Sequence, residues 1–220
     1  GCLRLLDRLD WALARAHPTL LVGYSDVTAL HLALYARAGW TGLSGPVVTE
    51  WAVVDDETLG PFRSLAAGGT FSVGSNQLHG LQPGTATGPL LGGNLSVLTR
   101  LVGTPYAPDW SGAVLAIEDV AEAPYRVDRM LAHLQHAGVL DAVEGVVLGA
   151  FSTGEDDHEP TLSLDTVFGD YFADRPYPVA AGLPYGHLLP RYTLPLGVPV
   201  HLSATPSEAR LEALAPAVQA

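Results

Sequence analysis

Lysine is absent from the chain: all eleven basic side chains are arginines, set against 23 acidic residues. The net charge of −12 leaves no basic patch of the kind that holds a phosphate backbone. We therefore exclude a nucleic acid as a partner. A solvated acidic surface explains the sign of the charge without any special function.

Cysteine occurs once, as Cys2, which excludes an internal disulfide and a metal site made of several cysteines. We expect Cys2 to be a small buried residue rather than a nucleophile. No histidine pair has a metal-ligand spacing with a supporting carboxylate, so we predict no metal and no cofactor. His158 to Pro160 are expected in a solvated acidic loop.

Long apolar segments are also missing. No run reaches the ~20 residues that span a bilayer, and charged residues interrupt the first positions, where a secretory signal would be apolar. We therefore predict no membrane partner and expect the protein in the cytoplasm.

What is present is an alternation of short apolar runs with helical patterns, which predicts an α/β fold. Residues 68–89, rich in Gly, Ser, Thr and Pro, are expected to form a β-hairpin or a linker between two lobes. We predict helices at 3–15, 27–38, 55–67, 92–101, 126–137 and 161–173, and strands at 19–24, 46–49, 113–117, 143–151, 177–181, 197–202 and 208–214.

Ser25 lies between a predicted buried strand and a predicted helix. A serine at such a turn is exposed above a sheet edge, where the next amide and the helix N-terminus can stabilise an oxyanion. The segment differs from the G-x-S-x-G elbow, because Val27 stands where that motif has its second glycine. Ser25 or Asp26 as a helix N-cap explains the same residues, and on local grounds this is the stronger interpretation.

Two further segments carry candidate groups. Glu118 and Asp119 end an apolar strand, where open α/β sheets bind ligands, and either could orient a histidine. His187 follows Gly186 in a Gly/Pro-rich loop after a strand, with the backbone freedom to approach a partner. Taken singly, the carboxylates are better explained as ordinary acidic residues of a solvated strand end.

Five motifs stand in order along the chain, at residues 23–31, 92–96, 103–106, 117–131 and 182–187. Together they resemble the LD-carboxypeptidases, a serine peptidase family that includes the microcin C immunity peptidases. Gly-Tyr-Ser-Asp-Val-Thr-Ala-Leu-His at 23–31 resembles the nucleophile segment of the family, the stretch 117–131 its glutamate segment, and Gly-Leu-Pro-Tyr-Gly-His at 182–187 its histidine segment. Gly-Gly-Asn-Leu-Ser at 92–96 and Gly-Thr-Pro-Tyr at 103–106 match further stretches.

The resemblance implies a catalytic triad of Ser25, Glu118 and His187, with the backbone amide of Asp26 as an oxyanion-hole donor. In the family a second donor comes from a glycine-rich turn just upstream of the segment that matches the start of this chain. We therefore expect the chain to lack roughly the first quarter of a family member. Arg191 departs from the asparagine usual at its position, a change near the site that could alter substrate choice.

The family fold implies two α/β domains and a homodimer. We predict an N-terminal domain at 1–80 that carries the nucleophile turn and is incomplete at its start, a linker at 81–91, and a C-terminal domain at 92–220 that carries the glutamate and the histidine.

The function implied is a serine-type LD-carboxypeptidase that releases terminal D-alanine from cytoplasmic murein tetrapeptide in cell-wall recycling. One alternative is a microcin C immunity-type peptidase that cleaves peptidyl or aminoacyl nucleotides, for which Trp51, Trp110 and Tyr106 offer aromatic surfaces. Another is a catalytically silent, peptide-binding member. The presence of all three triad residues argues against a silent protein.

Overall fold

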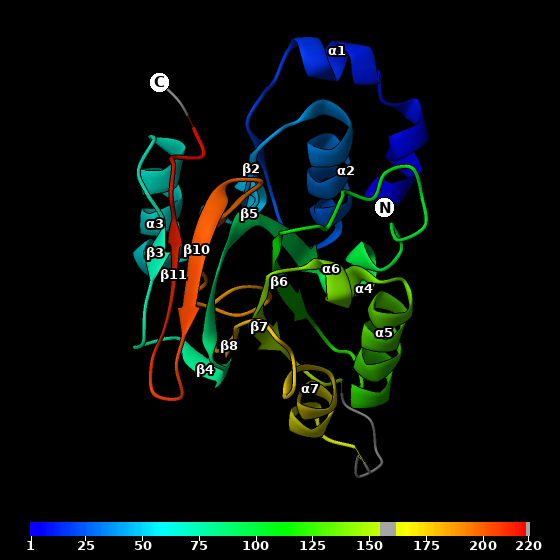
Figure 1. Cartoon of the computed structure of the whole chain (residues 1–220). Helices are drawn as coiled ribbons and strands as arrows, with labels where there is room; N and C mark the ends of the chain where they lie inside the picture. The colour runs from blue at the N-terminus through cyan, green and yellow to red at the C-terminus, as the bar shows by residue number, and fades with distance from the viewer. Residues whose placement is uncertain (155–161, 219–220) are drawn as a thin grey trace.

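The larger of two sheets has eight strands in the order β3-β11-β10-β5-β6-β7-β8-β4 (Figure 1). The computed structural model describes residues 1–154 and 162–218, so the predicted loop at His158 lies outside the described residues. Strands β5 to β8 are parallel, and the other pairs in this sheet are antiparallel. The strands are β3 (Ser72–Val73), β4 (His79–Gln82), β5 (Gly84–Asn94), β6 (Val114–Asp119), β7 (Gly145–Phe151), β8 (Val179–Ala181), β10 (Pro199–Ala204) and β11 (Ala209–Ala213).

A second sheet of three strands, in the order β1-β2-β9, holds the segment before the candidate nucleophile. It is formed by β1 (Leu21–Val22), β2 (Gly42–Ser44) and β9 (Leu194–Leu196). β1 and β2 are parallel, and β9 runs antiparallel to β2. The chain therefore returns to this sheet with its C-terminal part, after it has built most of the larger one.

Helices surround both sheets. They are α1 (Trp11–Ala16), α2 (Thr28–Ala38), α3 (Asp56–Ala66), α4 (Leu95–Leu98), α5 (Pro124–His136), α6 (Val139–Ala142) and α7 (Leu164–Phe172), with 3-10 turns η1 (Cys2–Arg8), η2 (Ser25–Val27) and η3 (Val48–Glu50). Among the described residues, no helix is both long and apolar enough to cross a bilayer.

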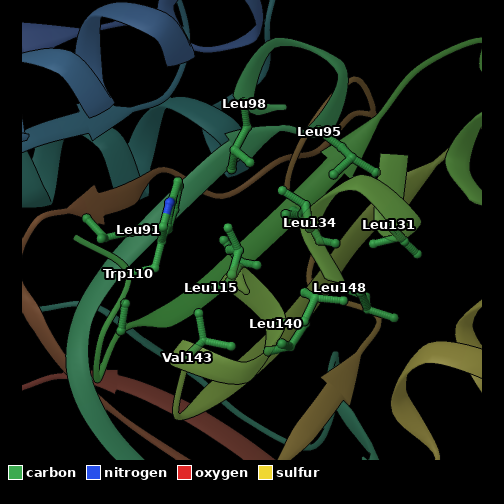
Figure 2. Packing of buried hydrophobic residues seen from close by; sticks show 14 of the residues in the cluster. Leu91, Leu95, Leu98, Trp110, Leu115, Leu131, Leu134, Leu140, Val143 and Leu148 are labelled. Carbon is green, nitrogen blue, oxygen red and sulfur yellow. The ribbon is translucent and has the colours of Figure 1, made fainter. Parts of the chain in front are cut away.

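Two hydrophobic clusters cover the two faces of the central strands. Leu115 and Ile117 of β6 point into the cluster formed with α4, α5 and α6, part of which Figure 2 shows. Val114 and Ala116 point into the other cluster, which includes residues of α3 and of the strands β9 to β11. Because successive side chains of a strand face opposite ways, an apolar run such as β6 is buried on both sides.

The predicted α/β fold class is confirmed, and several elements lie close to their predicted positions. Helix α2 ends at Gly39, whose left-handed backbone caps it. The hairpin predicted at 197–214 is formed by β10 and β11.

Other predictions at this level are wrong. The helix predicted over 3–15 is broken at Leu9, because the Asp10 side chain caps a separate helix, α1. Residues 46–49 are not a strand, since η3 begins at Val48. The helix predicted from residue 92 starts only at Leu95, after β5 has ended.

Residues 81–91, predicted as a linker, lie in β4 and β5 instead. Their Gly- and Thr-rich composition is typical of a linker, but β5 pairs with β10 along its first half and with β6 along its second. These two ladders satisfy the backbone hydrogen bonds that a linker would leave to water. The division of the chain into two domains stays a prediction.

Candidate active site

Ser25 lies at a strained turn between β1 and α2. Its φ angle is +58°, in the left-handed region, which costs a residue with a side chain about 1–2 kcal/mol. Gly23, two residues earlier, has a φ of +152°, and a Cβ there would come 3.0 Å from the Val27 side chain. The glycine thus permits the turn, and the strain is held at the residue whose hydroxyl the turn presents.

Glu118 occupies the end of β6 and is 1% exposed. Its Oε1 accepts a hydrogen bond of 3.2 Å from Nδ2 of Asn94, the residue opposite it in the register of β5. Its Oε2 lies 2.8 Å from Nδ1 of His187. A Cβ on Gly186 would lie 2.5 Å from this Oε2, so the close approach of the loop to the carboxylate requires glycine.

His187 joins the two other residues. Its Nδ1 contacts Glu118, and its Nε2 lies 3.0 Å from Ser25 Oγ. With the Nδ1 proton donated to the carboxylate, Nε2 is free to accept the proton of the serine hydroxyl. The structure therefore brings together the three residues expected as a triad, and their arrangement is that of an activated nucleophile, its base and the group that orients the base.

Asp119, the other carboxylate at this strand end, is bonded to Asn94 and to the start of α4. Its Oδ1 accepts from Asn94 Nδ2 at 2.8 Å and its Oδ2 from the Ser96 amide at 2.9 Å. Burial raises the pKa of Asp119, an effect that these hydrogen bonds offset only in part. Asp119 thus fastens the start of α4, and of the two acidic candidates only Glu118 contacts the histidine.

Asp26 is expected to provide an oxyanion donor through its backbone amide, which stays a prediction. The amide belongs to η2, directly after the nucleophile. The Asp26 carboxylate accepts a hydrogen bond of 2.7 Å from the Cys2 amide, which ties the turn to η1. Cys2 itself is half-buried, and burial raises the pKa of its thiol to about 11, so the thiol is protonated at neutral pH.

Sequence reasoning missed Glu50 and the role of Asn94. Asn94 lies in the motif at 92–96 that resembles the family, but the motif does not predict its hydrogen bond to Glu118. Glu50 lies in a segment wrongly predicted to follow a strand, and no local signal points to it. In the structure it binds both Tyr24 and Arg191.

Comparisons with known proteins agree on one family. The model of the LD-carboxypeptidase C-terminal domain matches residues 87–202, and that of the N-terminal domain matches residues 1–45. A probable murein peptide carboxypeptidase of Bacillus subtilis is 34% identical over 97% of this chain and 69% of its own length. The chain spans 64–69% of the length of this and two other curated relatives that it matches.

Solved structures are similar as well. The crystal structure of a muramoyltetrapeptide carboxypeptidase from Oxalobacter formigenes has a TM-score of 0.86 and 33% identity, over 96% of this chain and 73% of that one. An MccF-like protein from Bacillus anthracis has the same TM-score, 0.86, at 24% identity, over 98% of this chain and 73% of its own. At that identity the second likeness concerns the fold alone.

Proposed function

Because the chain belongs to the LD-carboxypeptidase family, we propose that it is a serine carboxypeptidase that releases terminal D-alanine from a murein tetrapeptide. The observation that carries this proposal is the hydrogen-bonded series Ser25–His187–Glu118, with contacts of 3.0 and 2.8 Å. The similarity to murein peptide carboxypeptidases supports the choice of substrate.

The proposed reaction begins when Ser25 Oγ attacks the carbonyl carbon of the bond between an L-configured centre and D-alanine. His187 Nε2 takes the hydroxyl proton as the C–O bond forms. Glu118 fixes the tautomer of the neutral imidazole before this step and stabilises the imidazolium that the step produces. The tetrahedral intermediate then collapses, the C–N bond breaks, and His187 gives its proton to the leaving amine of D-alanine. Water, deprotonated by His187, hydrolyses the acyl-enzyme and restores Ser25.

The developing oxyanion requires hydrogen-bond donors. We propose the Asp26 amide as one of them, at the start of the turn that leads into α2. A positioned donor of this kind is worth about 10²–10³ in rate in a well-studied protease.

The cellular setting follows from the same proposal. A murein tetrapeptide carboxypeptidase of this type would act in the cytoplasm, in cell-wall recycling. We also propose a homodimer, and a division into a domain at 1–80 with the nucleophile and a domain at 92–220 with the glutamate and histidine.

The alternative substrate is a peptidyl or aminoacyl nucleotide, as for the microcin C immunity peptidases. The likeness in fold to MccF is the reason to retain a nucleotide substrate as the alternative. Against it, Trp110 is 7% exposed and belongs to the hydrophobic core, and the Tyr106 hydroxyl donates to Asp7. Two of the three aromatic residues expected to hold a nucleotide base are thus engaged elsewhere.

The test is incubation with a murein tetrapeptide that ends in D-alanine, with free D-alanine measured by mass spectrometry. A Ser25→Ala variant and a tetrapeptide that ends in L-alanine serve as controls. Release by the unchanged protein alone, from the D-alanine peptide alone, supports the proposal. No release by either protein favours the nucleotide substrates, and equal release by both removes Ser25 from the mechanism.

A further inference from the structure

Three residues from distant segments meet beside the candidate triad. Arg191 Nη2 donates a hydrogen bond of 2.6 Å to Glu50 Oε2, and the Tyr24 hydroxyl donates one of 2.9 Å to Glu50 Oε1. The Arg191 guanidinium carbon lies 4.2 Å from the centroid of the Tyr24 ring. The three side chains therefore close a triangle, which we call the Tyr24 clamp.

The clamp touches the candidate triad at two points. Tyr24 directly precedes Ser25, so whatever holds the tyrosine also restrains the strained turn. The Tyr24 ring also packs on the His187 ring, with centroids 5.0 Å apart and planes inclined at 54°. One aromatic ring thus links the nucleophile turn and the base to the Arg191–Glu50 pair.

Arg191 is too enclosed to be a plain substrate contact. It is 4% exposed, and its Nε, also buried, donates no hydrogen bond to any residue in 1–154 or 162–218. An unsatisfied buried donor disfavours folding, and such breaches of packing rules are concentrated at functional sites. The contacts that the Arg191 side chain does make, to Glu50 and Tyr24, are those that lead to the candidate triad.

The charges of the clamp are balanced. Burial raises the pKa of Glu50, but the hydrogen bonds from Arg191 and Tyr24 and the charge of Arg191 outweigh it, so the pKa lies below its usual value. Burial and the bond to Glu50 raise the pKa of Tyr24, which keeps its proton. At neutral pH the clamp is thus one anion paired with one cation.

Resting on the proposed function, we propose that Glu50 and Arg191 are positioning residues that act through Tyr24. Through the Tyr24 ring they fix the positions of the His187 ring and of the Ser25 turn. Because the two charges cancel, the pair adds no net charge beside the imidazole. Among the described residues, the carboxylate hydrogen-bonded to His187 is Glu118. Asp119, on the same strand, is bonded to the start of α4 instead. Loss of Glu50 therefore makes the electrostatic potential at His187 more positive, and loss of Arg191 makes it more negative.

The deciding experiment is an NMR titration of the His187 imidazole, assigned by its loss in a His187→Gln variant. Glu50→Gln leaves an unpaired cation and is expected to lower the midpoint by roughly half a unit or more, and Arg191→Gln leaves an anion and is expected to raise it as much. Arg210→Gln, which removes an arginine from an exposed ion pair of β11, is the matched control and should move nothing. Midpoints that stay unchanged, or that move in the same direction, overturn the proposal.

Kinetics with the murein tetrapeptide give a second readout. Both clamp variants should lower kcat about 10- to 100-fold with little change in KM, since they misplace the reacting groups without touching the substrate. Tyr24→Phe keeps the ring and loses only the hydroxyl, and should show a smaller fall in kcat with the fold preserved.

A raised KM at constant kcat in Arg191→Gln would make Arg191 a substrate contact and overturn the proposal. If the unchanged protein releases no D-alanine, the proposed function fails, and the titration midpoints still decide on the clamp.

Discussion

The nucleophile and the acid of the candidate site are held in contrasting ways. Ser25 follows a two-residue strand of the small sheet, at a backbone angle that strains it. Glu118 is the last residue but one of β6, a six-residue strand at the centre of the larger sheet that pairs with a strand on either side, and its carboxylate is buried. The residue with the reacting hydroxyl is thus held at a strained backbone angle, whereas the carboxylate is held by a central strand of the larger sheet.

The loop that carries His187 connects these two regions. It leaves the larger sheet at β8 and enters the small sheet at β9. The hydrogen-bonded series is therefore complete only when both sheets are in place, and variants on either side should fail in different ways.

The largest effect is expected at the strained side. Ser25→Ala should lower kcat/KM by at least about 10⁴-fold, because the attacking oxygen is lost. Ser25→Gly should be equally inactive, yet more stable than Ser25→Ala by about 1 kcal/mol, because glycine adopts the left-handed angle without strain. Chemical denaturation of the two variants checks this. Equal stabilities would mean that the turn is not strained in solution.

The next largest effect is expected at the anchored side. Glu118→Gln should lower kcat about 10³–10⁴-fold, because the amide cannot hold the histidine in its useful tautomer. Asp119→Asn is the matched control one residue away, and should keep activity within about tenfold while losing about 1–2 kcal/mol of stability from weakened hydrogen bonds. Steady-state kinetics and thermal unfolding measure both. An equal loss of activity in the two variants would contradict the assignment of Glu118.

A third variant tests the contact between the regions. Gly186→Ala would place a methyl group 2.5 Å from Glu118 Oε2, at a φ of +115°. We expect about a 100-fold loss of kcat and a destabilisation of about 1–3 kcal/mol. Gly169→Ala in α7, where a Cβ meets nothing within 4 Å, should instead stabilise the protein by about 0.5–1 kcal/mol. If Gly186→Ala behaves like Gly169→Ala, the loop does not approach Glu118 as closely as the structure indicates.

The smallest effect concerns His31, whose side chain contacts the backbone of the turn that precedes Ser25. Its Nε2 lies 2.9 Å from the Gly23 carbonyl oxygen, and burial lowers its pKa to about 4, an effect that this hydrogen bond opposes. The unfolded chain binds a proton at this histidine near pH 6.5, so folding stability falls as the pH drops from 6.5 towards 4. From pH 7 to pH 5 this group should cost about 2 kcal/mol.

Urea unfolding of the unchanged protein and of His31→Gln at pH 7 and pH 5 measures this contribution. The variant keeps a donor for the Gly23 carbonyl but has no titrating group, so its stability should depend less on pH by about that amount. The same loss of stability in both proteins would show that His31 is not buried in its neutral form.

Local patterns were sufficient for much of the architecture. Helix α2 was predicted from an apolar helical stretch that Gly39 ends, and β7 from an apolar run typical of a covered parallel strand. The failures lie where a side chain or a distant strand overrides composition. Asp10 splits a helix that the leucine pattern made continuous, and pairing with β10 and β6 turns a glycine-rich segment into β5.

The sequence by itself determined the chemistry on offer: a serine at a strand-to-helix turn, two adjacent carboxylates, and a histidine in a glycine-rich loop. Which of these meet was decided by the tertiary structure. Glu118 and Asp119 both accept from Asn94 Nδ2, but the second oxygen of Glu118 contacts His187 and the second oxygen of Asp119 accepts from Ser96 in α4. Glu50 reached Tyr24 and Arg191 only through folding, because these residues lie 26 and 141 positions from it and no local pattern records contacts at such separations.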